Sequence, residues 1–201
     1  MTQIINLNCP GCGAPVSTSQ KQCEYCTRPV VITSFSSVQA MSPLELNKYV
    51  GTYRKVLAEN PDNQALNAAI AHCYLKLKLY DKALPAFEKA IEDNFDHSET
   101  FFYAAVCLLK GQKAFVASRT DIDKIEEYLN AALMIEPRGI YYYFQSYIKY
   151  DYFHRKYLNT TPSYREALQM AIDNGVSGAD IEQLFGVTGI EIPHELLIIS
   201  S

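Results

Sequence analysis

The sequence predicts a mainly α-helical protein that carries a small β module at its N-terminus. Apolar residues recur at helical spacing through most of residues 42–185, and two of these runs begin with a Ser-x-x-Glu capping signal. The first 33 residues instead hold four cysteines in two Cys-x-x-Cys pairs. Apolar residues make up 48% of the chain and charged residues 20%, so the sequence indicates a folded chain and not a disordered one.

The paired cysteines have the spacing of metal ligands, and they are Cys9, Cys12, Cys23 and Cys26. Two intervening residues let the backbone turn tightly so that both thiolates of a pair face one cation, and two such turns complete a tetrahedral shell. Gly13 follows the first turn, where a positive φ is often needed, and Thr27 holds the equivalent place at a cost in strain. Four thiolates leave no open position for water, so the sequence predicts one structural Zn²⁺ ion.

This pattern resembles the zinc-ribbon family, in which two such turns on short strands hold one zinc ion. The resemblance covers about residues 1–33, with strands expected at residues 4–5 and 30–32. A redox dithiol and an iron–sulfur cluster are the alternatives, but a redox motif comes as one pair near a βαβ pattern. Because so short a segment cannot bury a core of its own, we expect chelation to unfold it and to leave the helices largely intact.

Helix signals begin after residues 34–41, a serine-rich stretch that we interpret as a linker. Ser42, Pro43 and Glu45 supply the cap, the first position and the capping box of a helix that stops at residues 60–61. In residues 64–95, small and aromatic residues then fall at the fixed intervals of the tetratricopeptide repeat (TPR) pattern. They are Ala71, Tyr74, Ala83, Phe87 and Ala90. The alanines let two antiparallel helices approach closely, and the aromatic rings fill the space around them.

The resemblance to TPR proteins extends over roughly residues 62–174. A second, weaker copy spans residues 98–137 and carries a longer loop at 110–120, and a third, degenerate copy spans residues 138–174. The resemblance implies an array of antiparallel helix pairs, with an irregular helical bundle as the alternative. The chain therefore divides into a zinc ribbon (1–33), a linker (34–41), a TPR-like domain (42–175) and a C-terminal extension (176–201) that is expected to cap the last repeat.

TPR proteins commonly bind an extended peptide on the concave face formed by the first helix of each repeat. Here the resemblance implies an apolar, aromatic groove with five candidate partner-binding residues. They are His72, Phe102, Tyr103, Tyr142 and Tyr143. The alternative is that these rings belong to the core, because residues 141–157 contain nine aromatics, of which at least half must be buried.

Charge and motifs narrow the class of function. Residues 1–79 carry seven Lys/Arg against four Asp/Glu, and residues 80–201 carry eleven against eighteen, which argues against a nucleic-acid partner. No phosphate loop, nucleophile elbow or His–carboxylate metal motif is present, so we expect no enzyme. No apolar run approaches the ~20 residues of a membrane span and the first residues lack the features of a secretory signal, so we expect a cytoplasmic protein.

The leading hypothesis is a non-enzymatic adaptor or scaffold that binds another protein or peptide through the concave helical face. The alternative is a nucleic-acid-associated accessory factor, in which the ribbon contacts DNA or RNA and the helices recruit other proteins. A third hypothesis has the repeats drive self-association.

Overall fold

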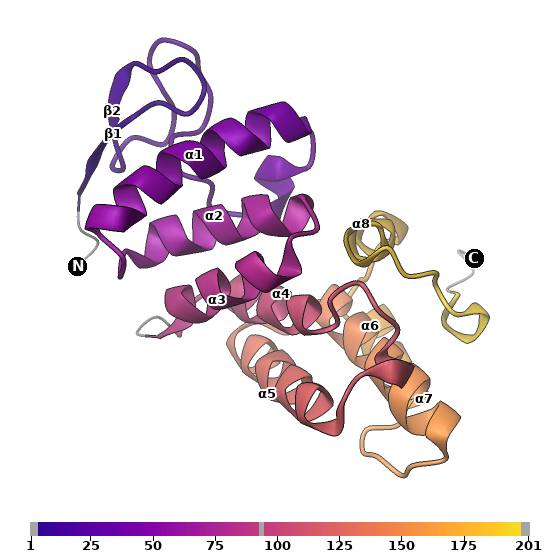
Figure 1. The fold of residues 1–201 in the computed structure, drawn as a ribbon. Coiled ribbons are helices and arrows are strands. Elements are labelled where there is room, and N and C mark those ends of the chain that lie inside the picture. Colours follow the sequence, from indigo (N-terminus) through magenta and orange to yellow (C-terminus); the bar gives the residue numbers. More distant parts are fainter. Residues whose placement is uncertain (1–3, 93–94, 198–201) are drawn as a thin grey trace. The chain divides into compact units, whose positions relative to one another are not determined.

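The computed structural model describes residues 4–92 and 95–197 and confirms a mainly helical chain with a small N-terminal sheet (Figure 1). It divides into two compact units, Met1–Phe95 and Asp96–Ser201. This division falls within the predicted helical domain and not at residues 34–41. In the described residues, no helix combines the length and the apolar character needed to cross a membrane.

The sheet of the first unit is a two-stranded hairpin around the first pair of cysteines. β1 (Asn6–Asn8) and β2 (Pro15–Ser17) pair antiparallel, with Leu7 opposite Val16. The strands predicted at residues 4–5 and 30–32 are therefore misplaced. The first cysteine turn brings residues 15–17 back beside β1. The second turn is instead flanked by one isolated bridge, between Gln22 and Pro29, after which the chain leaves the sheet.

Three helices complete the first unit: α1 (Pro43–Glu59), α2 (Gln64–Lys76) and α3 (Tyr80–Ile91). The predicted capping box opens α1, since the Glu45 N–H donates to Ser42 Oγ (3.3 Å) and the Ser42 N–H donates to Glu45 Oε2 (3.0 Å). α2 and α3 pack against each other as a helix pair, and Ala71, Ala83 and Phe87 are fully buried. The predicted role of these small and aromatic residues is thereby confirmed.

Within residues 34–41, which are predicted to form a linker, Phe35 and Val38 are packed in the core. Phe35–Val38 forms a 3-10 helix whose end residues are both buried, and the Phe35 ring lies 6.3 Å from that of His72 on α2. Because a 3-10 helix has three residues per turn, two apolar residues three apart share one face. The serines between them, which suggested a linker, occupy the remaining positions.

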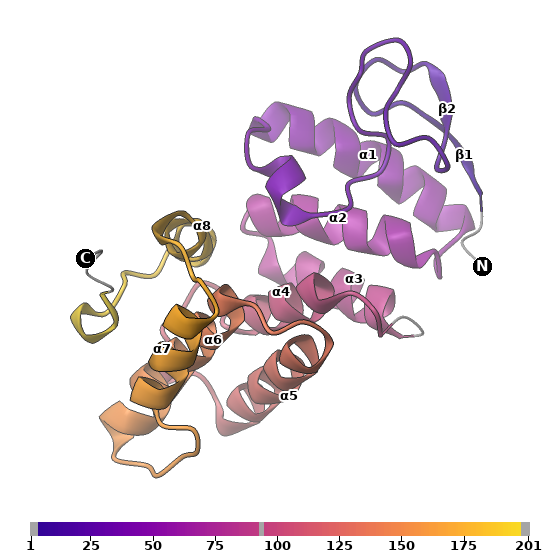
Figure 2. The same ribbon diagram turned by 180° about the vertical axis from the view of Figure 1, so that it is seen from behind.

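The second unit consists of two further helix pairs and a C-terminal helix (Figure 2). α4 (Ser98–Leu108) pairs with α5 (Arg119–Ile135), and α6 (Gly139–Ile148) pairs with α7 (Tyr164–Asp173). These pairs correspond to the predicted second and third copies. α6 continues into a π-helical turn, Lys149–Phe153, and a short 3-10 helix, His154–Lys156.

The C-terminal residues of the second unit pack on α4 and α6. α8 (Gly178–Thr188) contributes Gln183, whose amide donates to the Tyr103 hydroxyl (3.1 Å). Beyond α8, the Leu196 carbonyl accepts from the Tyr143 hydroxyl (2.7 Å). The extension therefore covers aromatic side chains of two different helix pairs.

Gly139 allows the start of α6 to approach the end of α7, which generates a first prediction. A Cβ at this position would lie 2.5 Å from Val176 N and 2.8 Å from the carbonyl oxygens of Ala171 and Asn174. Since backbone atoms cannot rotate away, Gly139→Ala should lower the free energy of unfolding by about 1–3 kcal/mol, measured by chemical denaturation.

The matched control is Gly186→Ala within α8, where an added Cβ meets nothing within 4 Å. Alanine loses less backbone entropy than glycine on folding, so this variant should be as stable as the wild type or slightly more stable. Equal stability of the Gly139→Ala variant and the wild type would contradict the close approach of α6 and α7.

Candidate functional site

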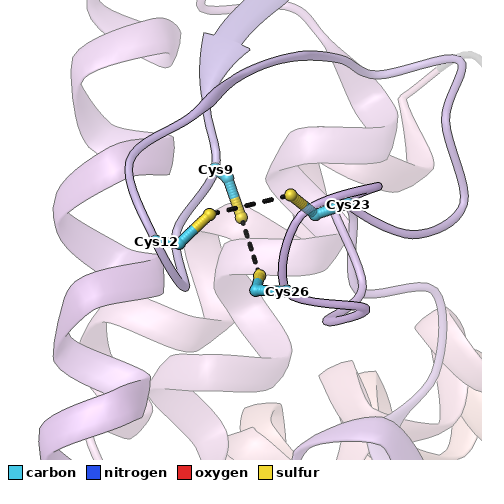
Figure 3. A group of neighbouring side chains, drawn as sticks. All are labelled: Cys9, Cys12, Cys23 and Cys26. Carbon is cyan, nitrogen blue, oxygen red and sulfur yellow. Dashed lines mark hydrogen bonds between the residues drawn. The ribbon is translucent and has the colours of Figure 1, made fainter.

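The side chains of Cys9, Cys12, Cys23 and Cys26 point toward one another, as Figure 3 shows, and their four sulfur atoms lie within 4.8 Å of one another. The Cys9–Cys26 sulfur distance is 3.6 Å and the Cys12–Cys23 distance is 3.7 Å. Four sulfurs around one cation at ~2.3 Å lie roughly 3.8 Å apart, whereas a disulfide requires ~2.05 Å. The cluster therefore has the dimensions of a tetrahedral site for a single metal ion.

The two cysteine turns have the same backbone hydrogen bonds. The Gly13 N–H donates to the Cys9 carbonyl, and the Thr27 N–H donates to the Cys23 carbonyl, both at 2.8 Å. Gly13 has φ +82° and Thr27 has φ +59°, so the positive φ predicted at both places is confirmed. Thr27 occupies a conformation that glycine adopts more easily, and the turn nevertheless forms there.

The electrostatics of the cluster favour a bound cation. Burial opposes ionisation of Cys23, but hydrogen bonds from the backbone N–H groups of Tyr25 and Cys26 and from neighbouring thiols lower its pKa to about 7. At Cys26 the Arg28 N–H favours the thiolate, yet burial and the three other sulfurs raise the pKa to about 12. The cluster thus favours ionisation of Cys23 and opposes that of Cys26, and a bound cation would compensate the charge of both thiolates.

The second cysteine turn is held against α1 by side chains that the sequence did not single out. The Tyr49 hydroxyl donates to the Pro29 carbonyl and the Tyr53 hydroxyl to the Val30 carbonyl, each at 2.9 Å. Tyr53 also accepts from the Ile32 N–H at 3.2 Å. The two tyrosines lie one helical turn apart on the buried face of α1, a spacing that indicates core packing but not these hydrogen bonds.

An ion pair adds to this attachment. Arg28, which lies two residues after Cys26, places its Nη2 2.7 Å from Glu45 Oε1. The carboxylate that caps α1 therefore also binds the chain just after the second cysteine turn. Hydrogen bonds from Ser42 and the charge of Arg28 lower the pKa of Glu45. The cysteine module and α1 are therefore parts of one packed body.

An open groove of about 710 Å³ runs between the first cysteine turn with β1 and one face of α1. Its helical side carries the exposed residues Lys48, Gly51 and Lys55. Sequence reasoning missed this groove, because its existence depends on how α1 lies against the sheet.

Of the five predicted partner-binding residues, the structure buries all but Tyr142, which is half-buried. His72 lies in the first unit with its ring 5.2 Å from that of Phe87, and burial lowers its pKa to about 3, so it is neutral at physiological pH. In the second unit Phe102 stacks on Tyr141 at 4.5 Å. Among the five residues, Tyr142 therefore retains the accessible surface that a partner could contact.

The aromatic segment 141–157 is mainly core, in agreement with the alternative given for it. Six of its nine aromatic residues are buried, two are half-buried, and Tyr157 is exposed. The phenolic hydroxyls inside the core find partners, as Tyr147 does by accepting from the Ala114 N–H at 3.1 Å. Most of these rings therefore hold the helix pairs together.

Comparison with known proteins supports the helical-repeat fold. The tetratricopeptide repeat family model matches residues 51–112. A crystal structure of MamA is similar, with a TM-score of 0.55 at 13% identity over 72% of this chain and 80% of that chain. A structure described as "MamA MSR-1 C2" has a TM-score of 0.46 at 19% identity, over 70% and 68% of the two chains. No curated protein sequence matches this chain.

The chain therefore combines a TPR-like helical fold with an N-terminal cysteine cluster of zinc-ribbon type. The likeness to the MamA crystal structure, at 13% identity, establishes the fold alone.

The contact between the cysteine module and α1 generates a second prediction. Tyr53→Phe removes the donor to Val30 and leaves the buried Ile32 N–H without its acceptor. The free energy of unfolding should fall by about 1–3 kcal/mol, because an unpaired buried polar group costs that much. Tyr25→Phe, at an exposed position in the second cysteine turn, is the control and should change stability little. Equal stability of both variants would show that the Tyr53 hydrogen bonds do not hold the module.

Proposed function

We propose that this protein is a non-enzymatic scaffold that binds other proteins, and that its N-terminal module is held by one structural Zn²⁺ ion. The observation that carries the scaffold function is the TPR match over residues 51–112, since stacked helix pairs of this type form extended protein-binding surfaces. The helix pairs of both units support it. Cytoplasmic location and the absence of catalysis are parts of the same proposal.

The cysteine cluster fits zinc better than the alternatives considered for it. A redox dithiol needs one reactive pair, whereas here a sulfur of each pair lies 3.6–3.7 Å from a sulfur of the other pair. An iron–sulfur cluster places its own iron and sulfide atoms among the cysteine sulfurs, and so needs them further apart than 4.8 Å. Four thiolates around one Zn²⁺ ion form a closed shell, which assigns the metal a structural role.

In this proposal the metal joins two parts of the first unit. Cys9 and Cys12 belong to the hairpin of β1 and β2, whereas Cys23 and Cys26 belong to the turn that Tyr49 and Tyr53 hold against α1. The ion neutralises the thiolate charge that the cluster would otherwise resist. A rigid surface is thereby attached directly to the helices.

Metal removal gives the third prediction. Elemental mass spectrometry should find about one Zn²⁺ ion per molecule in the intact chain purified under reducing conditions. It should find none in the Cys9→Ser/Cys23→Ser variant. Chelation should lower amide hydrogen-exchange protection in residues 5–32 and also in α1, whose Tyr49 and Tyr53 hydroxyls lose ordered partners. This differs from the expectation from sequence, in which chelation unfolds residues 1–33 and leaves the helices largely intact. Unchanged protection of residues 5–32 after chelation would rule out a structural metal.

Partner capture tests the scaffold function, and it is the fourth prediction. The intact chain, cross-linked in its native host and purified, should enrich a reproducible set of proteins over a tag-only control. Binding to a random oligonucleotide should be weak. Tight, steeply salt-dependent oligonucleotide binding would favour the nucleic-acid alternative. A folded chain that enriches only itself would instead favour self-association.

A further inference from the structure

Two features of the second unit that depart from the TPR pattern lie against each other. The first is the inserted loop at 110–120, which forms a 3-10 helix at Ala114–Val116. The second is the extension of α6 by the π-helical turn Lys149–Phe153. The Phe115 N–H donates to Asp151 Oδ2 at 2.8 Å, and the Ala114 N–H donates to the Tyr147 hydroxyl. The backbone of the inserted loop is therefore fixed by the extended helix.

Positive charge gathers where the two features meet. The guanidinium carbon of Arg155 lies 4.6 Å from the Phe115 ring centroid, and Lys156 Nζ lies 5.1 Å from it. Arg155 also pairs with the buried Asp151. In the part of the chain that the structure describes, Lys156 forms no ion pair; its ammonium lies 3.7 Å from the Tyr152 ring. One positive charge is thus available to a partner's carboxylate.

This local charge is opposite to that of its surroundings. Residues 96–201 carry fourteen Asp/Glu against nine Lys/Arg. Five of those nine basic residues fall in segments 110–119 and 154–158, which contain no acidic residue. Two of the five, Arg119 and Arg155, pair with Asp123 and Asp151 outside these segments, so the five basic residues and these two acidic ones together carry a net charge of +3. An approaching acidic chain is therefore attracted to this place and repelled by most of the rest of the unit.

Exposed apolar side chains lie among these charges. Phe115 is 37% exposed, Val116 is 64% exposed and Leu158 is 44% exposed. Tyr157 is 97% exposed and has φ +57°, the left-handed conformation in which glycine usually ends a helix. Among the described residues, its exposed ring gains no packing that would offset this strain. Exposed aromatic and apolar groups beside cations are typical of protein-binding surfaces.

We propose that this surface docks an acidic segment of a partner protein, and that the segment also carries aromatic or aliphatic residues. The surface, called the insertion surface, consists of Phe115, Val116, Arg155, Lys156, Tyr157 and Leu158. The partner's carboxylates would meet Lys156 and Arg155, and its apolar side chains would cover Phe115, Tyr157 and Leu158. The inference rests on the proposed scaffold function, and it places a contact outside the concave face that the TPR resemblance implies. A nucleic-acid strand fits less well, because the unit around the surface is acidic.

Selection of displayed peptides tests this proposal on the intact, metal-loaded chain. The probe is a phage library of random twelve-residue peptides, and bound clones are remade as fluorescent peptides for titration. The test variant is Lys156→Glu/Tyr157→Gly, which reverses the available charge and removes the exposed ring while easing the backbone strain. The control variant is Met134→Ser/Arg165→Glu, which makes matched changes at exposed positions on α5 and α7. Denaturation midpoints establish that both variants fold.

The expected result is enrichment of peptides that contain Asp or Glu together with aromatic or aliphatic residues. They should bind the test variant at least tenfold more weakly than the wild type, and the control variant as well as the wild type. Enriched peptides that bind both variants equally would overturn the insertion surface and leave the scaffold function standing. If the test variant loses oligonucleotide binding but keeps peptide binding, the insertion surface binds nucleic acid and the proposal is wrong. No enrichment over empty beads, combined with no partner capture by the intact chain, would overturn both proposals.

Discussion

The hydroxyl groups of Tyr49 and Tyr53 join two kinds of structure that otherwise have little in common. On one side is a module too small to bury a core of its own, in which four sulfurs converge. On the other is a helical repeat whose order depends on close packing of alanine and aromatic side chains. Tyr53 is fully buried and both donates to and accepts from the chain after the second cysteine turn. Through it, the position of the cysteine cluster is tied to the first helix of the unit.

This attachment changes how the N-terminal module is understood. A module on a flexible linker would act as an independent binding domain, whereas here residues 34–41 are themselves part of the packed unit. The Arg28–Glu45 ion pair and the groove beside α1 are further consequences of the same packing. Under the proposed function, a structural metal in such a place would stabilise more than its own ligands, because the chain after the second turn is hydrogen-bonded to α1.

In the second unit, the aromatic residues serve mainly to hold helix pairs together. Tyr103 and Tyr143 hydrogen-bond to the C-terminal extension, so these side chains of the helix pairs are covered by the chain itself. The exposed aromatic residues Phe115 and Tyr157 lie instead where the repeat pattern is interrupted, at the inserted loop and beyond the π-helical turn. In the described residues of this unit, exposed aromatic side chains therefore mark the interruptions of the repeat, whereas the aromatic side chains within the helix pairs are mainly core.

The sequence by itself determined the features whose causes are local. The cysteine spacing, the capping box at Ser42 and Glu45, and the positive φ at Thr27 each depend on a few neighbouring residues, and each was found as predicted. The TPR pattern of α2 and α3 was also readable, because close helix packing requires small residues at fixed intervals. Tertiary structure alone decided which strand pairs with β1, which of the nine aromatics are buried, and how residues 34–41 pack. Those outcomes depend on contacts between segments far apart in the chain, and no local pattern of residue types encodes which surfaces will meet.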